Sequence, residues 1–291
     1  MEIGLLTPFI PERLDRARAL GIRTLQIRLG PGFPIDTEDP DLHEAREAAD
    51  RLRSGDFSVP VLGFYRNHLA PDPELRELED RRLRNVLRMA PLFGARAVGV
   101  FAGRDPELPL EDNYPRFQEV WTPLARAAEQ AGVRIAFENC TMYRGYPVRG
   151  INIAYCPAAY ERLFELVPSP ALGIEFDPSH CVKLMIDPLE FLRAFPGRIV
   201  HFHAKDHQRD SAALQQYGCF DVRTSQDRFP GFGEVDFTAL LRELSRQNYP
   251  GPVTIEAERD PDFATEEEIR HALARSVHHL GEALARAKSS G

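Results

Sequence analysis

Cysteine is scarce in this chain, and the few cysteines present are not spaced as a metal or disulfide framework. The four cysteines, Cys140, Cys156, Cys181 and Cys219, form no Cys-x-x-Cys pair. Zinc knuckles need such close pairs, and small secreted folds need a denser set of cysteines. The sequence therefore argues against both classes, and we expect a reduced, cytoplasmic setting.

Long apolar runs and clusters of basic residues are also missing. No segment approaches the roughly 18 consecutive apolar residues of a membrane span. The opening segment MEIGLLTPFIPERLDRA has no basic stretch ahead of a long apolar one, as a secretion signal would. Acidic residues outnumber basic ones by 44 to 36, and the net charge is −8. We therefore expect neither a membrane nor a nucleic acid as a partner.

Short apolar runs alternate with longer amphipathic segments along all 291 residues. The composition, 43% hydrophobic and 27% charged, is typical of a globular protein with a sizeable core. Strand-like runs lie at 2–6, 24–29, 59–64, 97–102, 133–138, 172–177, 199–203 and 252–256. Helical periodicity follows each run, at 11–20, 39–53, 73–93, 112–131, 157–167, 188–195, 236–247 and 265–287.

The eight strand and helix repeats predict an α/β fold with a parallel sheet. A closed (β/α)8 TIM barrel, forming a single domain over 1–291, is the simplest arrangement for this length. A doubly wound open sheet is the alternative. That fold usually has a glycine-rich phosphate turn after its first strand, and TPFIPE is not such a turn.

Helix ends carry recognisable signals. Gly21, Gly94 and Gly132 stand just past predicted helices, where a residue with positive φ often ends a helix. Thr265 with Glu268 has the spacing of a capping box at the start of the last helix.

Four strand-like runs end on a possible metal ligand: VRIAFE at Glu138, LGIEFD at Asp177, RIVHFH at His203 and PVTIE at Glu256. In a closed barrel these side chains would emerge at one rim, because neighbouring strands lie only about 5 Å apart. Three oxygen donors and one nitrogen suit one divalent cation, with Mn²⁺ as first choice and Mg²⁺ or Co²⁺ as alternatives. Strand ends also carry polar residues where a chain meets solvent, but buried acids are costly unless they are paired or metal-bound.

Two long connections, 139–156 and 204–235, would lie at the same rim, where barrel enzymes place their active sites. The first is rich in Tyr and Arg and predicts one wall of a polar pocket, unless it packs on its own aromatic rings. His201 and His203 share a strand face, and only one need bind metal. We favour His203 and expect His201 to be a supporting or core residue.

Three neighbouring polar residues have two interpretations each. Lys205 and Asp206 are as well explained by a solvated surface pair as by substrate contacts. Asn139 either orients Glu138 by a hydrogen bond or makes a turn at the start of its loop.

The segments FENC, FDPSH, HFHAKDHQR, PGFGEVDF and TIEAE resemble the xylose-isomerase-like TIM-barrel superfamily of sugar isomerases and epimerases, from IGLLTPF to the last strand. The catalytic pattern is most similar to that of ketose 3-epimerases. The resemblance implies one divalent metal on Glu138, Asp177, His203 and Glu256. It also implies that Glu138 and Glu256 form the acid/base pair, and that His180 and Arg209 contact the substrate. Contacts from the early strands are not identifiable in GFYRNHLAPD.

The chemistry supports the same roles. Removing a proton beside a ketone requires charge stabilisation, and two carboxylates on opposite faces of a sugar can take and return that proton. Both glutamates are alternatively ligands alone, with water carrying the proton. We predict a metal-dependent isomerase or epimerase of a ketose or keto-sugar, with a small-molecule sugar as its partner. The sequence is also compatible with a homo-oligomer.

Three other functions compete with this prediction. A dehydratase or lyase of a keto-inositol or keto-glycoside begins with the same proton abstraction. An AP-endonuclease-like phosphodiesterase would need further metals and further histidines, and AVGVFAGRD supplies none. A non-catalytic sugar-binding barrel is disfavoured because all four ligands are present.

Overall fold

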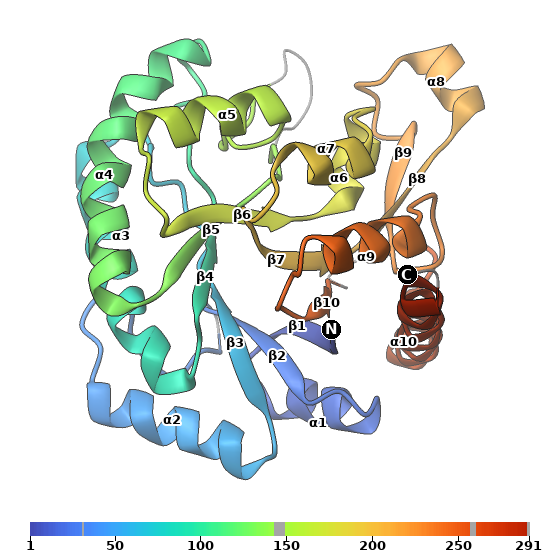
Figure 1. Ribbon diagram of the computed structural model, residues 1–291, viewed down its shortest axis with the longest axis horizontal. Helices are drawn as coiled ribbons and strands as arrows, with labels where there is room; N and C mark the ends of the chain where they lie inside the picture. Colours follow the sequence, from blue (N-terminus) through green and yellow to red (C-terminus); the bar gives the residue numbers. More distant parts are fainter. Residues whose placement is uncertain (31, 143–148, 257–259, 290–291) are drawn as a thin grey trace.

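The apolar runs of the sequence pair side by side into a closed barrel of parallel strands (Figure 1). The computed structural model describes residues 1–30, 32–142, 149–256 and 260–289. In barrel order the strands are β1 (Ile3–Pro8), β10 (Val253–Ile255), β7 (Ile199–Ala204), β6 (Leu172–Phe176), β5 (Arg134–Glu138), β4 (Ala97–Val100), β3 (Ser58–Gly63) and β2 (Thr24–Arg28). The first and last strands close the ring through the register Ile3↔Val253. The predicted TIM barrel is confirmed, and the open-sheet alternative is wrong.

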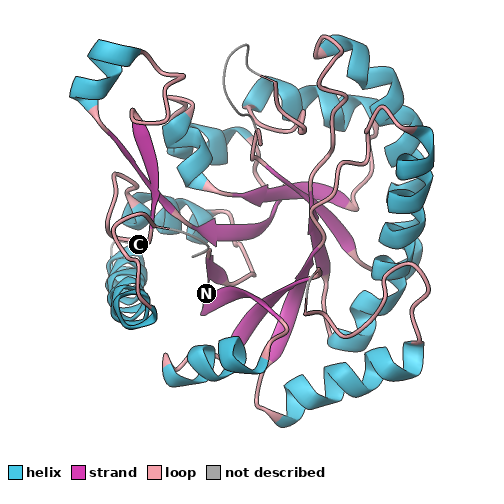
Figure 2. Ribbon diagram, turned by 180° about the vertical axis from the view of Figure 1, so that it is seen from behind, coloured by secondary structure: helices cyan, strands magenta, loops and turns pink. Residues whose placement is uncertain are grey.

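Helices surround this ring, as the view from behind shows (Figure 2). They are α1 (Pro11–Ala19), α2 (Leu42–Ser54), α3 (Pro73–Phe93), the short η1 (Glu111–Asn113), α4 (Tyr114–Ala131), α5 (Pro157–Leu166), α6 (Pro178–Lys183), α7 (Pro188–Ala194), α8 (Ser211–Tyr217), α9 (Phe237–Arg246) and α10 (Glu266–Ser289). In the described ranges, none of the helices combines the length and apolarity that crossing a membrane demands.

The predicted helix signals operate as expected. Gly94 ends α3 with φ +78° and Gly132 ends α4 with φ +67°, a region of backbone space that glycine enters without strain. At the start of α10, Glu268 donates its backbone N–H to the Thr265 hydroxyl at 3.2 Å. In return, the Glu268 carboxylate accepts from the Thr265 backbone N–H at 2.8 Å. The capping box is therefore confirmed.

Aromatic side chains fasten the helices to the barrel. Trp121 of α4 is fully buried and meets Phe137 of β5 edge-on, with 4.6 Å between the ring centroids. Its indole N–H donates to the Ala102 carbonyl at 2.9 Å, so the polar atom of this large side chain is satisfied. This packing holds α4 against the strand that ends at Glu138.

The prediction that 204–235 forms a loop is wrong in part. Strands β8 (Asp206–Arg209) and β9 (Ser225–Arg228) form an antiparallel ribbon, and α8 lies in the connection between them. Figure 1 shows this ribbon beside α6 and α7. The strand sequences DHQR and SQDR contain no apolar residue, so hydrophobic alternation could not reveal them. The short α6, directly after Asp177, was not predicted either.

Candidate active site

The structure brings the four predicted ligands together at the carboxyl rim of the barrel. Glu138 ends β5, Asp177 follows β6, His203 lies in β7 and Glu256 follows β10, and these strands are neighbours in the ring. One ligand atom of each residue lies within 4.8 Å of those of the other three, and all four side chains are buried.

Asp177 is held by both its side chain and its backbone. It is the N-cap of α6: its Oδ1 accepts from the Ser179 backbone N–H at 2.8 Å, which leaves Oδ2 toward the cluster. The Asn139 side chain donates to the Asp177 carbonyl at 2.9 Å and accepts from its N–H at 2.7 Å. Asn139 therefore fixes the backbone of Asp177, a role that differs from both interpretations of the sequence.

The His203 ring connects two environments. On one side, Nδ1 lies 2.9 Å from Glu256 Oε2 and 3.6 Å from Glu138 Oε1. On the other, Nε2 lies 2.7 Å from Gln26 Oε1 and 3.2 Å from Glu175 Oε1. The nitrogen that faces the other predicted ligands is therefore Nδ1, while Nε2 faces Gln26 and Glu175 below the cluster.

A divalent cation fits this cluster. Within the described residues, His203 Nδ1, Asp177 Oδ2 and Glu256 Oε2 are buried without a hydrogen-bond partner. The 2.9 Å separation of Nδ1 and Oε2 is short, but the pair is not oriented as a hydrogen bond. Each buried unpaired polar atom costs about 1–3 kcal/mol, so a common ligand at their meeting point explains the arrangement. Carboxylate oxygens with one imidazole suit Mn²⁺, Mg²⁺ or Co²⁺.

Two basic side chains lie beside the predicted ligands. His180 Nε2 is 3.3 Å from Asp177 Oδ2 and 3.6 Å from Glu138 Oε1. The Lys205 ammonium donates to Glu256 Oε1 at 3.0 Å and lies 4.0 Å from Asp177 Oδ2. His180 therefore lies beside the cluster, and its contact with a substrate stays a prediction. Lys205 lies beside the same cluster.

The surrounding charges move the ligand pKa values in different directions. Burial raises the pKa of Asp177 to about 6, against the opposing pull of His180 and Lys205. Burial also works to raise the pKa of Glu256, but Lys205 and His203 hold it well below its usual range. Glu256 is therefore the carboxylate of the cluster that is held most firmly in its ionised form.

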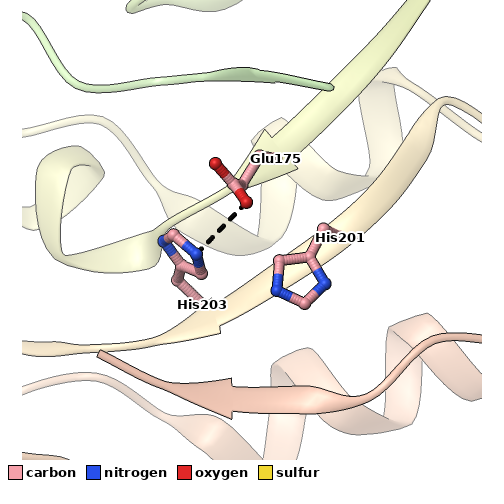
Figure 3. A group of neighbouring side chains, drawn as sticks. All are labelled: Glu175, His201 and His203. Atoms are coloured by element: carbon pink, nitrogen blue, oxygen red, sulfur yellow. Dashed lines mark ion pairs between the residues drawn. The ribbon is translucent and has the colours of Figure 1, made fainter. Parts of the chain in front are cut away.

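A sealed polar network lies beneath the ligands, and sequence reasoning missed it. Figure 3 shows Glu175 reaching from β6 toward His203, which shares one strand with His201. Glu175 accepts from the Gln26 amide at 2.7 Å and from the Tyr65 hydroxyl at 2.8 Å, and it is fully buried. Glu175 lies two residues before Asp177, on the same strand face, and this spacing is the signal in the sequence that could have predicted its inward position.

Gly99 of β4 has no side chain, and the Glu175 carboxylate occupies the space next to it. A Cβ atom at Gly99 would lie 2.5 Å from both carboxylate oxygens of Glu175. Glycine is therefore required at this strand position by a close approach.

Arg209 lies apart from the cluster. Its guanidinium donates to Glu234 Oε2 at 2.9 Å and 3.1 Å, and its side chain is 38% exposed on β8. Substrate binding by Arg209 would require this ion pair to open, and it stays a prediction. Asp206 accepts backbone N–H groups of Gly231 and Gly233 at 3.0 and 2.9 Å and is buried. The interpretation of Lys205 and Asp206 as a solvated surface pair is therefore wrong.

A cavity of about 660 Å³ opens over the cluster. Its wall contains Glu138, Glu256, His180 and Lys205, and Tyr65 links it to the buried network. Cys140, Thr141 and Met142, at the start of the predicted loop 139–156, also line it. Residues 143–148 of that predicted wall lie outside the described residues.

The family model of the xylose isomerase-like TIM barrel matches residues 14–277. The chain belongs to this family, as its segments and ligand spacing predicted.

Proteins that are similar to this chain are named for several activities. An inosose dehydratase of Geobacillus kaustophilus (strain HTA426) is 31% identical over 128 residues, which cover 41% of this chain and 42% of that protein. The chain spans about half the length of the curated relatives it matches. A structure of L-ribulose 3-epimerase superposes with a TM-score of 0.71 at 17% identity, covering 100% of this chain and 97% of the other. Mannonate dehydratase from Streptococcus suis serotype 2 gives 0.77 at 14% identity, covering 100% and 96%. These two likenesses show the fold.

Proposed function

We propose that this protein is a divalent-metal-dependent isomerase or epimerase that removes a proton beside the carbonyl of a ketose or keto-sugar. The observation that carries the proposal is the meeting of Glu138 and Glu256 with Asp177 and His203 at the wall of an open cavity. Two of these carboxylates line the cavity, so each can be both a ligand and a proton carrier.

The roles follow from the contacts. A bound divalent cation, with Mn²⁺ as our first choice, would stabilise the negative charge that develops when the proton leaves. Glu256, kept ionised by Lys205 at 3.0 Å, accepts that proton. Glu138 returns a proton from another side of the substrate. His180 has its Nε2 near both Asp177 and Glu138, where it can donate to a substrate oxygen.

Dehydration is the second candidate, and two observations favour it. The curated relative named above is an inosose dehydratase. The Lys205 ammonium also lines the cavity, where it could protonate a departing hydroxyl group after the same first step. Epimerisation preserves the mass of the substrate, whereas dehydration removes one water, so product analysis separates the two.

The test is a screen of Mn²⁺-loaded protein against ketoses, keto-inositols and 3-keto-glycosides in D₂O, read by NMR and mass spectrometry. We expect solvent deuterium at the carbon beside the carbonyl. Glu138→Gln and Glu256→Gln keep an oxygen donor, and each should slow this exchange by at least about 10²-fold, the low end for lost acid/base help. Glu79→Gln is the matched control, because Glu79 is a buried, ion-paired glutamate on α3.

Normal exchange in both active-site variants would refute the two-carboxylate assignment. Product formed without solvent deuterium would indicate hydride transfer instead.

A further inference from the structure

A second cavity of about 380 Å³ adjoins the one over the metal cluster. Thr141 and Lys183 line both cavities, so the two share a wall. The second cavity differs in character: Leu110, Leu184 and Phe220 contribute apolar surface to it.

Two methionines at these cavities have an unusual backbone. Among the described residues other than glycine, four have positive φ: Asp56, Met142, Met185 and Asn248. Asp and Asn tolerate this conformation, but Met does not favour it, and such strain costs of order 1–3 kcal/mol. Met142 (φ +50°) lines the first cavity and Met185 (φ +59°) lines the second.

The same side chains are more exposed than large apolar residues usually are. Met185 is 60% exposed, Phe220 49% and Met142 42%. Single exposed apolar residues are ordinary, but these three gather at two adjoining cavities. Methionine adapts its shape to an apolar ligand, and it forms favourable contacts with aromatic rings.

We propose that the second cavity is a subsite for an apolar, ring-sized group attached to the keto-sugar that the metal cluster holds. This inference rests on the proposed function for its sugar half. The shared wall places the two groups in neighbouring spaces, and about 660 Å³ beside about 380 Å³ gives room for more than a single sugar ring. The substrate class is then an aryl or similarly apolar glycoside of a keto-sugar.

Asn152 ties the subsite wall to the metal ligands. Its side chain donates to the carbonyl groups of Glu138 at 2.9 Å and Cys140 at 2.6 Å, and it accepts from the Ala102 N–H at 3.0 Å. It is buried and also lines the second cavity. The wall of the subsite is therefore fixed to the strand end that carries Glu138.

The experiment compares methyl and 4-nitrophenyl 3-oxo-β-glucopyranoside as probes for the Mn²⁺-loaded protein, with binding measured by titration calorimetry. Burying a ring of phenyl size should make the aryl probe bind about 10- to 100-fold more tightly. Met185→Gly and Phe220→Ser should each reduce that ratio at least threefold. Glycine adopts positive φ freely, so Met185→Gly should fold. Val222→Ser is the control, since Val222 is 87% exposed and, in the described part of the chain, lines neither cavity.

Equal affinity for the two probes, or no binding of the aryl probe, would overturn the subsite. So would an unchanged ratio in both Met185→Gly and Phe220→Ser. Deuterium exchange is recorded separately on the methyl probe and on free ketoses. Absent exchange with a preserved aryl preference would refute the proposed function and leave the subsite standing.

Discussion

Glu175→Gln should weaken metal binding although Glu175 is not among the four predicted ligands. The carboxylate lies 3.2 Å from His203 Nε2, on the side of the ring opposite the cluster. A negative charge in this position raises the basicity of the imidazole and fixes its orientation, so that Nδ1 faces the metal. Glutamine preserves the size of the side chain and removes the charge.

The contacts that remain set the size of the effect. Gln26 Oε1 still accepts from His203 Nε2 at 2.7 Å, so the tautomer of the ring is retained. The new amide can accept from Gln26 and donate to the Tyr65 hydroxyl, so both neighbours keep partners. The substitution therefore removes only a carboxylate that supports a predicted ligand from behind. Such a change lowers metal affinity about 10- to 100-fold, or by about 1.4 to 2.7 kcal/mol. We expect a value near the lower limit.

The assay is a Mn²⁺ titration followed by competition with a chelator of known affinity, together with thermal unfolding of the metal-free protein. Glu79→Gln should bind Mn²⁺ as the wild type does. A Mn²⁺ affinity for Glu175→Gln within twofold of the wild type, with or without a change in melting temperature, would refute the argument. Glu175 would then stabilise the barrel interior only.

Three further predictions use other parts of the site and core. Gly99→Ala should lower Mn²⁺ affinity much as Glu175→Gln does, because its Cβ would displace the Glu175 carboxylate. Asp177→Ala should abolish tight Mn²⁺ binding, and elemental analysis of the wild type should find about one equivalent of metal. His68 is buried, which lowers its pKa to about 3, and the nearby Arg66 adds to this shift. Because its unfolded pKa is about 6.5, stability should fall as the pH drops below that value, by about 2 kcal/mol at pH 5. His68→Leu should remove that part of the difference between urea unfolding curves at pH 7.5 and pH 5.

The fold was predictable because each barrel strand carries its own apolar signal. Strands β5 and β6 are almost fully buried, so they read as continuous apolar runs between amphipathic helices. The ribbon β8–β9 has no such signal, because its two strands contain no apolar residue and are joined by backbone pairing and polar side-chain contacts. The short α6 lacks a clear signal for another reason: the strand-end pattern marks Asp177 as a ligand, and the same residue is also the cap of this helix.

The four predicted ligands can be recognised from their positions at strand ends, whereas the residues that support them cannot. A strand end shows which residue reaches the rim, so Glu138 and Glu256 could be named from the sequence. Glu175 lies one layer deeper, and its partners Gln26 and Tyr65 come from distant strands. The spacing between His203 and Arg209 gave no comparable information, because a new ribbon begins between them and changes the direction of the chain.

Side chains along strand β7 and just after it lie at different depths in the barrel and have different surroundings. His201 and His203 of β7 and Lys205 just after it alternate along the chain, and their surroundings change stepwise from buried to open. His201 contacts the buried Gln26. His203 links that network to the cluster, and Lys205 reaches the cavity. In the proposed function the cluster abstracts a proton in either reaction, so the choice between epimerisation and dehydration should depend on groups at the level of Lys205 and above.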